Sequence, residues 1–315
     1  MKKSKVYVSG HTGMVGSRLV KFLKKKNFDL ITKTRSELDL TNQKTVQNFL
    51  KKEKPDQIYI AAAKVGGIKA NINKPAEFIY ENLVIQSNII HGAFINKINN
   101  LLFISSSCVY PKVSKQPIRE ESLLFGPLEK SVEPYAVAKI AGMKLCENYN
   151  NQYSLDYKSI VPNNLYGPGD TYDQENSHVV AALIKKFHDA KVKNSPNVTL
   201  WGSGRPLREF LYIDDFVRSC ILLMNKEKKF LKKNLSKFNY YNVGSGSEIS
   251  ILGLAQKIKK VVNYKGSIQF DLKKPDGIKR KFLNTSRIQR LGWKPKISLL
   301  EGLKKTYKDF KNLNT

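Results

Sequence analysis

The fold of this chain is decided by its opening stretch, Lys5-Val6-Tyr7-Val8-Ser9-Gly10-His11-Thr12-Gly13-Met14-Val15-Gly16. Its first five residues form a short β-branched run, which is typical of a buried strand. Three glycines follow at a regular spacing, and the next ten residues carry apolar side chains at helical spacing. The order strand, glycine turn, helix is the context in which such glycines bind phosphate. The stretch therefore predicts a dinucleotide-binding loop.

Each glycine has its own expected role at a bound diphosphate. Gly10 permits the tight turn after the strand, Gly13 lets the pyrophosphate approach the backbone, and Gly16 lets the helix pack closely on the strand. The N–H groups and the dipole at the start of the following helix favour an anion there. The spacing is Gly-x-x-Gly-x-x-Gly rather than the Gly-x-Gly-x-x-Gly of many dehydrogenases, and a purely structural turn is the alternative.

Strand and helix patterns continue to alternate through the first half of the chain. Further strands are expected at Asp29–Thr32, Asp56–Ile60, Leu101–Ile104 and Lys158–Pro162. A long helix is expected from Pro75 to about Asn96, and another from about Tyr135 to about Tyr153. This alternation predicts an α/β fold with a Rossmann-like, doubly wound parallel sheet.

After residue 164 the pattern changes, and a second, smaller domain is expected. Residues 1–164, with a return segment at about 212–245, are predicted to form the dinucleotide-binding domain. Residues 165–211 and 246–315 are predicted to form a C-terminal α+β substrate domain. A helix over Val179–Ala190, a strand near Val198–Trp201 and a helix over Ile251–Val262 are expected within it.

Composition bounds the function classes. The chain has 315 residues, 41% of them hydrophobic, which is enough for a sizeable core and argues against disorder. Neither a signal-peptide pattern nor an apolar run long enough for a membrane span is visible, and three cysteines without paired spacing give no disulfide framework or zinc site. A cytoplasmic protein without a metal is expected.

The formal net charge of +29 raises the alternative of a nucleic-acid-binding protein. The lysines are spread over the whole chain, as on solvated helix faces, and no nucleic-acid-binding motif is visible. We therefore expect no nucleic-acid partner, although the positive field can attract an anionic substrate.

Basic residues at the end of the second expected strand indicate which dinucleotide binds. An acidic residue at this place usually holds a free ribose 2′-hydroxyl, whereas an arginine accommodates a 2′-phosphate. Here Arg35 follows the strand, helped by Lys33, so NADP is favoured over NAD. Asp39 is a candidate neighbour of the adenine. The alternative for Arg35 is an ordinary surface residue.

Tyr135 and Lys139 form the expected centre of the chemistry. Residues four apart lie on one face of a helix, and a nearby ammonium favours the phenolate, so the pKa of Tyr135 is expected to fall below about 10. Ser106 and Cys108 follow the strand Leu101–Ile104, and chemistry in such sheets sits at the carboxyl ends of strands. The small residues around Ala62 would let a cofactor lie against the backbone.

These residues resemble the extended short-chain dehydrogenase/reductase superfamily, through the glycine loop, Ser106, Tyr135 and Lys139. Within it the chain is similar to the GDP-L-fucose synthases, the 4-keto-6-deoxy-D-mannose epimerase–reductases. The resembling pieces are Gly10–Gly16, Ala61–Gly67, Ser106–Pro111, Glu133–Met143, Pro162–Pro168, Ser177–Val179, Trp201–Gly204, Arg208–Phe210 and Lys274–Gly277. That family commonly carries Arg where Thr12 stands here, which leaves more of the 2′-phosphate contact to Arg35.

The resemblance implies an NADPH-dependent enzyme that epimerises GDP-4-keto-6-deoxy-D-mannose at C3 and C5 and then reduces C4. It implies Cys108 as base and His178 as acid for epimerisation, and Ser106, Tyr135 and Lys139 for the reduction. From the residues alone, Cys108 fits a small core residue and His178 a surface group at a helix start. A homodimer is also implied.

The remaining implied contacts fall into two sets. The cofactor set is Gly10, His11, Thr12, Gly13, Met14, Val15, Gly16, Arg35, Asp39, Ala62, Ile104, Ser105, Ser106, Ser107, Tyr135, Lys139, Pro162, Asn163, Asn164, Leu165 and His178. The set for the nucleotide end of the substrate is Lys186, Trp201, Arg208 and Asp276, with Lys279 added as a candidate cation for the diphosphate. The rival within the superfamily is a nucleotide-sugar 4-epimerase or 4-reductase, which would give no role to Cys108 with His178.

Overall fold

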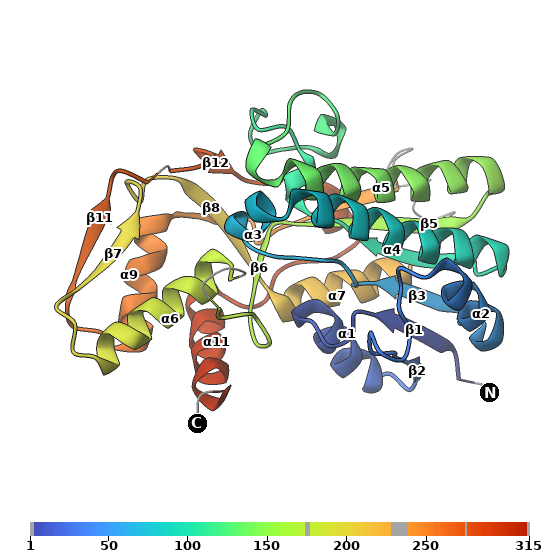
Figure 1. Cartoon of the computed structure of the whole chain (residues 1–315), viewed down its shortest axis with the longest axis horizontal. Coiled ribbons are helices and arrows are strands. Elements are labelled where there is room, and N and C mark those ends of the chain that lie inside the picture. The colour runs from blue at the N-terminus through green and yellow to red at the C-terminus, as the bar shows by residue number, and fades with distance from the viewer. Residues whose placement is uncertain (1–2, 174–176, 228–238, 275, 314–315) are drawn as a thin grey trace.

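The computed structural model describes residues 3–173, 177–227, 239–274 and 276–313. Figure 1 shows a layered α/β arrangement, with a large sheet between helices and a smaller group of strands and helices at one end. Part of the expected return segment, residues 228–238, lies outside the described residues.

The large sheet confirms the predicted fold class. It has six parallel strands in the order β2 (Asp29–Ile31), β1 (Lys5–Ser9), β3 (Gln57–Ile60), β4 (Asn100–Ile104), β5 (Asp156–Pro162) and β9 (Tyr240–Val243). The chain moves outward from β1 to β2 and then resumes on the other side at β3. Ligands of such sheets bind at the carboxyl ends of the strands where the direction reverses, which here is between β1 and β3.

Helices cover both faces of this sheet because its strands are apolar on both sides. Val6 and Val8 of β1 belong to a buried cluster that includes residues of α1 (Met14–Lys24) and α7 (Ile213–Met224). Tyr7, between them, belongs to a second cluster with residues of α2 (Gln43–Glu53), α4 (Pro75–Ile95) and α5 (Glu133–Tyr153). Burying an aliphatic side chain of this size contributes about 1.5–3 kcal/mol, so both layers stabilise the sheet.

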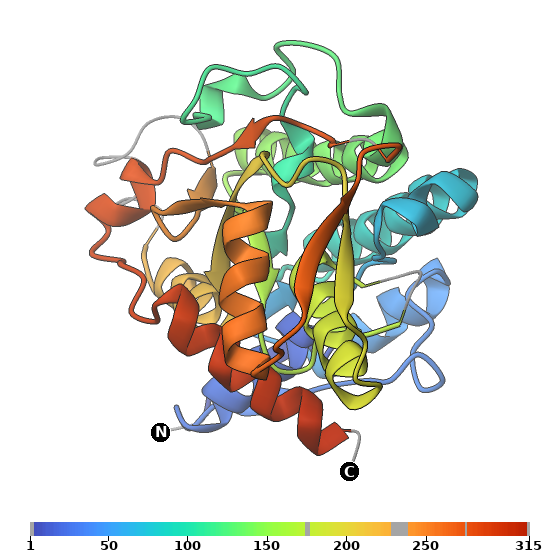
Figure 2. The same cartoon turned by 90° about the vertical axis from the view of Figure 1, so that its left-hand side faces the viewer.

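The smaller part is built around β8 (Leu207–Tyr212). This strand pairs in parallel with β6 (Asn164–Tyr166) and β12 (Arg280–Lys281), and antiparallel with β10 (Glu248–Ser250). A separate parallel pair is formed by β7 (Asn197–Trp201) and β11 (Ser267–Asp271). The helices α6 (Val179–Val192), α9 (Ile251–Val262) and α11 (Leu299–Leu313) lie with these strands at the left-hand end of Figure 1, the end that faces the viewer in Figure 2.

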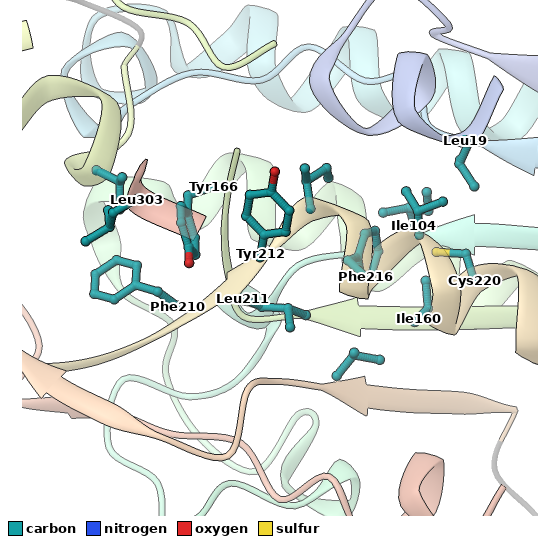
Figure 3. Close-up of a cluster of buried hydrophobic side chains, with 14 of the residues drawn as sticks. Leu19, Ile104, Ile160, Tyr166, Phe210, Leu211, Tyr212, Phe216, Cys220 and Leu303 are labelled. Carbon is teal, nitrogen blue, oxygen red and sulfur yellow. The ribbon is translucent and has the colours of Figure 1, made fainter. Parts of the chain in front are cut away.

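The two parts share one hydrophobic core. Tyr166, Phe210 and Leu303 of the smaller part belong to the same buried cluster as Leu19 and Ile160 of the large sheet and its helices (Figure 3). The helix α7 begins directly after β8, with Tyr212 as its N-cap, and packs on β4 and β5. The chain therefore returns to the large sheet through α7.

Several short elements complete the described chain. They are α3 (Ile68–Asn73), α10 (Ser286–Arg290) and the 3₁₀ turns η1 (Ser107–Val109), η2 (Glu120–Ser122) and η3 (Lys130–Val132). The first helix begins at Met14, earlier than the apolar pattern from Ser17 indicated, because Gly13 already serves as its N-cap. Within the described ranges, no helix combines the length and the apolar character needed to cross a bilayer.

Candidate active site

The glycine loop lies at the reversal point of the sheet and packs against the residues that follow β3. Gly10 has a φ of +68°, and a Cβ placed on it would lie 2.7 Å from the Cα of Ala62. A Cβ on Gly16 would lie 2.7 Å from the carbonyl carbon of Gly10 and 2.8 Å from the Cα of His11. Both positions therefore exclude any side chain, since the neighbouring atoms are backbone.

The loop leaves its anion-binding groups free. Gly13 is the N-cap of α1 without a side-chain cap, and a Cβ on it would meet only the carbonyl oxygen of Gly10, at 3.6 Å. The first N–H groups of α1 can therefore face a phosphate. His11 has a buried Nδ1 without a hydrogen-bond partner among the described residues. A backbone cradle with open donors and an orphaned ring nitrogen fits a dinucleotide diphosphate.

Arg35 lies on the exposed segment after β2, with its side chain in solvent. Its expected helper, Lys33, forms an ion pair with Glu37 at 3.3 Å. Asp39 accepts hydrogen bonds from the Thr41 N–H at 2.9 Å and the Thr41 hydroxyl at 2.7 Å, which lower the pKa of its carboxyl. Of these residues, Arg35 is the cation with the freest side chain for a 2′-phosphate.

Tyr135 and Lys139 project from the first turns of α5, whose start carries Pro134. The Lys139 Nζ donates to the Ile104 carbonyl at 2.9 Å and lies 5.6 Å from the Tyr135 ring centroid. The Phe103 ring is 4.8 Å from the same ammonium. Lys139 is thus anchored at the carboxyl end of β4, and its ammonium lies beside the ring of Tyr135.

Burial changes the acid–base properties of this pair in a way the sequence did not predict. Desolvation lowers the pKa of Lys139 from 10.5 to about 8, although the Cys108 sulfur raises it. Desolvation and the Cys108 sulfur together raise the pKa of Tyr135 above its ordinary value. The expected lowering of the Tyr135 pKa by Lys139 was therefore wrong, because loss of water outweighs the field of the ammonium. A protonated phenol at neutral pH is suited to donate a proton.

Cys108 lies in η1, directly after β4, on the same side as Tyr135. Its N–H donates to the Ser106 hydroxyl at 3.4 Å, and its sulfur interacts electrostatically with Tyr135 and Lys139. Burial raises the pKa of the Cys108 thiol, while Lys281, Ser106 and Lys139 act in the opposite direction. The structure therefore brings Ser106, Cys108, Tyr135 and Lys139 into one place.

Lys281 of β12 is a neighbour of Cys108 that the sequence analysis missed. Both residues line a small pocket of about 20 Å³, with Tyr110, Gln116 and Ile118. Desolvation lowers the pKa of Lys281, and the Cys108 sulfur raises it. No motif marks this lysine, because it is one of many and becomes special only when β12 pairs with β8.

Other residues of the expected cofactor set are buried in structural hydrogen bonds. The Asn163 amide donates to Glu209 at 2.6 Å, and its carbonyl oxygen accepts from the Ser107 hydroxyl at 3.3 Å. Asn164 donates to the Asn163 carbonyl oxygen at 3.1 Å, and the Ser105 hydroxyl lies 3.1 Å from the Met143 sulfur. These side chains are held by contacts within the protein, and their backbone is what a cofactor could touch.

His178 belongs to a different element, the start of α6, and no interaction in the described part of the chain joins it to Cys108, Tyr135 or Lys139. It is the N-cap of α6, and its side chain is 52% exposed. Its Nδ1 lies 3.9 Å from the carboxylate of Asp170, a residue that the sequence analysis did not select. The other two cysteines, Cys146 and Cys220, are fully buried thiols.

The residues expected at the nucleotide end gather around β7 and the start of β8. The Lys186 ammonium donates to the Thr199 carbonyl at 2.5 Å, and Trp201, at the end of β7, is 65% exposed with Lys274 over its ring at 5.5 Å. Arg208 is partly buried in β8, and burial lowers the pKa of its guanidinium.

The loop before β12 contacts the residues that follow β7 and the start of β8. Asp276 accepts from the Ser203 N–H at 2.6 Å and the Ser203 hydroxyl at 2.8 Å. A Cβ on Gly277 would lie 3.6 Å from an Arg208 nitrogen. Lys279 joins β8 through its backbone carbonyl, which accepts from the Leu207 N–H at 2.9 Å, while its side chain is exposed.

A parallel sheet with a glycine loop at its reversal point and a Tyr/Lys pair beside it defines a nicotinamide-dinucleotide-dependent class of protein. The chain belongs to the NAD dependent epimerase/dehydratase family, whose model matches residues 6–244.

Individual relatives are more specific. The chain is 50% identical over 312 residues to the GDP-L-fucose synthase of Escherichia coli (strain K12), covering 98% of this chain and 97% of that protein. A GDP-6-OMe-4-keto-L-xylo-heptose reductase from C. jejuni superposes with a TM-score of 0.93 at 37% identity, over 100% and 99% of the two chains. A GDP-L-fucose synthetase from Naegleria fowleri bound to NADP superposes with a TM-score of 0.87 at 26% identity, over 100% and 97%. The resemblance to the GDP-L-fucose synthases is thus confirmed.

Proposed function

We propose that this protein catalyses the 3,5-epimerisation of GDP-4-keto-6-deoxy-D-mannose and then its NADPH-dependent reduction at C4, giving GDP-L-fucose. The observation that carries this proposal is the electrostatic proximity of Cys108 to Tyr135 and Lys139 at the carboxyl end of β4. It stands in a chain that is 50% identical to a GDP-L-fucose synthase. A plain ketone reductase needs the tyrosine and the lysine but has no use for the thiol.

The reduction uses the residues at the carboxyl end of β4. NADPH, when bound, supplies the hydride to C4. Tyr135 gives its phenolic proton to the C4 oxygen, and Ser106 donates a hydrogen bond to the same oxygen. Because burial raises the pKa of Tyr135, the phenol carries this proton at neutral pH. Lys139, held by the Ile104 carbonyl, keeps a positive charge beside the phenol and can reach a ribose hydroxyl.

Epimerisation needs a base and an acid on opposite faces of the sugar ring. The Cys108 thiolate removes the proton from C3 or C5, and the bond electrons move onto the C4 oxygen, where Tyr135 and Ser106 stabilise the enolate. His178 returns a proton to the carbon from the other face. Burial raises the pKa of the Cys108 thiol, and the positive charges of Lys281 and Lys139 act against this rise and toward the thiolate. The same donors thus serve the enolate and the later alkoxide, which explains how one site runs both reactions.

The cofactor is proposed to be NADPH rather than NADH. The support is the exposed Arg35 after β2, with no acidic residue at that place, and the fit of the glycine loop to a diphosphate. The solved relative from Naegleria fowleri, described as bound to NADP, is in agreement. His11, Thr12, Met14 and Val15 would contact the diphosphate with the glycines.

The nucleotide of the substrate is assigned to the region between β7 and β12. Lys186 and Arg208 would neutralise the diphosphate, Trp201 would cover the base, and Asp276 would accept hydrogen bonds from the nucleoside. Lys279 would act only from the rim, since its side chain is exposed. The proposed substrate domain is therefore residues 165–211 with 246–315, and the cofactor domain is residues 1–164 with the segment 212–245.

A second candidate is a GDP-sugar 4-reductase without epimerase activity. It is favoured by the superposition on the C. jejuni reductase and by the exposed position of His178. The two candidates differ in one observable: an epimerase exchanges protons at C3 and C5 with solvent, and a plain reductase does not.

Assembly and location are also proposed. Exposed apolar side chains on α4 and α5, namely Tyr80, Val137 and Tyr153, support a homodimer through these helices. All three cysteines are free thiols, which suits the reducing cytoplasm. No nucleic-acid or membrane partner is assigned.

The test is incubation with GDP-4-keto-6-deoxy-D-mannose and NADPH in deuterium oxide, with products identified by NMR. The expected product is GDP-L-fucose with deuterium at C3 and C5. Tyr135→Phe is expected to abolish NADPH oxidation, because the proton donor is lost, while the protein stays folded. Undiminished NADPH oxidation by the Tyr135→Phe variant would refute the role of Tyr135 as the proton donor. A product without deuterium at C3 and C5 would refute the epimerase activity and support the 4-reductase instead.

A further inference from the structure

Asp170 lies in a loop that is fitted closely to the cofactor end of the molecule. The loop follows β6, and Gly169 in it has a φ of +82°. A Cβ on Gly169 would lie 3.7 Å from the Met14 Cα and 3.7 Å from the Ser17 hydroxyl, both at the start of α1. The Gly169 N–H donates to the Asp309 carboxylate of α11 at 3.0 Å. The backbone that carries Asp170 is thus held on two sides.

The carboxylate of Asp170 is buried without a full set of partners. Its side chain is 4% exposed, and one oxygen, Oδ1, accepts from the Thr171 N–H at 2.8 Å. The other oxygen, Oδ2, is buried and has no hydrogen-bond partner in the described part of the chain. An unsatisfied buried acceptor costs about 1–3 kcal/mol, and more when it is charged. A hydrogen-bond donor from a neighbouring side chain would stabilise such a carboxylate.

The ring of His178 is the basic group that stands beside this carboxylate. Its Nδ1 lies 3.9 Å from Asp170 Oδ1, which is within ion-pair range but longer than a hydrogen bond. His178 makes no side-chain cap to α6, so its ring is free to turn toward the carboxylate. Catalytic hydrogen bonds are often long without substrate and shorten when it binds.

The other ionisable groups near Asp170 are engaged elsewhere or repel it. The Tyr172 hydroxyl donates to the Thr306 carbonyl at 3.5 Å, and the Asp309 carboxylate accepts from Gly169. Burial raises the pKa of the Asp170 carboxyl, and the charge of His178 lowers it. The imidazole is therefore the neighbour that favours the ionised carboxylate.

We propose that Asp170 is the positioning residue of His178: its carboxylate accepts the Nδ1–H of the imidazole and leaves Nε2 directed toward the sugar. This inference rests on the proposed function, in which His178 returns a proton to C3 or C5. When Nε2 has given its proton to the carbon, the neutral ring that remains carries its hydrogen on Nδ1. That is the tautomer a carboxylate at Nδ1 stabilises. The Asp170 carboxylate thus selects both the ring orientation and the reactive nitrogen.

Two variants and one matched control test this role. Asp170→Asn removes the charge, and Asp170→Ala removes the acceptor. Asp309→Asn alters a contact of the same loop without touching the ring. We expect both Asp170 variants to lose about tenfold or more in the rate of solvent deuterium entry at C3, since a positioned acid contributes about 10²–10⁴-fold. NADPH affinity should change less than about threefold, and Asp309→Asn should exchange like the wild type.

A substrate-free readout separates this inference from the proposed function. The chain has four histidines, so the ring nitrogens can be followed by ¹⁵N NMR, with His178→Gln assigning the signal. The wild type should show the Nδ1–H tautomer at His178, and both Asp170 variants should lose it. An unchanged tautomer, or wild-type exchange in folded variants, overturns the inference. Equal losses in Asp309→Asn would assign Asp170 to loop structure and overturn it as well. Absence of turnover in the wild type refutes the proposed function, while the tautomer result still decides the pairing.

Discussion

Replacing the glycines of the first loop one at a time separates folding from cofactor binding. In Gly16→Ala the new methyl would stand 2.7 Å from the Gly10 carbonyl carbon and 2.8 Å from the His11 Cα. Both neighbours are backbone, so helix α1 must move away from the loop by more than about half an ångström to reach ordinary contact near 3.5 Å. Overpacking of this kind costs about 1–3 kcal/mol, and alanine in a helix returns about 1 kcal/mol. Because the clash is with backbone atoms, the upper end of this range applies, and we expect a net loss of about 2 kcal/mol and weak NADPH binding.

Gly13→Ala is the matched control, because its methyl meets open space. The nearest atom is the Gly10 carbonyl oxygen at 3.6 Å, and the φ of −77° suits any residue. The cofactor-free protein should therefore lose less than about 1 kcal/mol, the usual cost of a poorer N-cap. The methyl stands where a diphosphate must approach the N–H groups of α1, so affinity for NADPH should fall.

Urea denaturation with and without NADPH measures both effects. Ligand at about 100 times its Kd stabilises a folded protein by about 2.7 kcal/mol. The wild type should gain this increment, Gly13→Ala should lose most of it at the same NADPH concentration, and Gly16→Ala should start from a lower stability. A Gly13→Ala protein that binds NADPH like the wild type would refute the phosphate-loop reasoning. Equal cofactor-free stabilities of the two variants would refute the packing reasoning for Gly16.

Three further outcomes are expected. Cys108→Ser should stop solvent deuterium from entering C3 and C5, because a hydroxyl is too weak a base, and normal exchange would count against the thiol. Arg35→Ala should raise the KM for NADPH about tenfold or more while leaving that for NADH nearly unchanged, because only the 2′-phosphate contact is lost; equal changes would remove the assignment. Burial lowers the pKa of Lys139 from 10.5 to about 8, so the cost of its buried charge is complete below pH 8 and is relieved as the pH rises toward 10.5. The stability of the cofactor-free wild type relative to Lys139→Met should therefore increase by about 3 kcal/mol across that window, and a flat difference in urea titrations would contradict it.

The sequence alone determined the features that are local in the chain. Gly10, Gly13 and Gly16 stand between a β-branched run and a helical pattern, and the structure has the expected turn and helix there. The Tyr135–Lys139 pair depends only on the four-residue spacing of a helix. The repeated alternation of strand and helix patterns along the chain was enough to predict a sheet covered on both faces. Such signals are readable because the period of the side chains repeats within a few residues.

Tertiary structure decided everything that depends on distant segments or on lost water. Lys281 reaches Cys108 only because β12 pairs with β8. Asp170 and His178 meet across a loop whose closure no local pattern encodes. The sign of the Tyr135 pKa shift was wrong because spacing shows the nearby charge but not the burial that outweighs it. Burial and long-range pairing are properties of the whole folded chain, so they become visible only when the segments are placed in space.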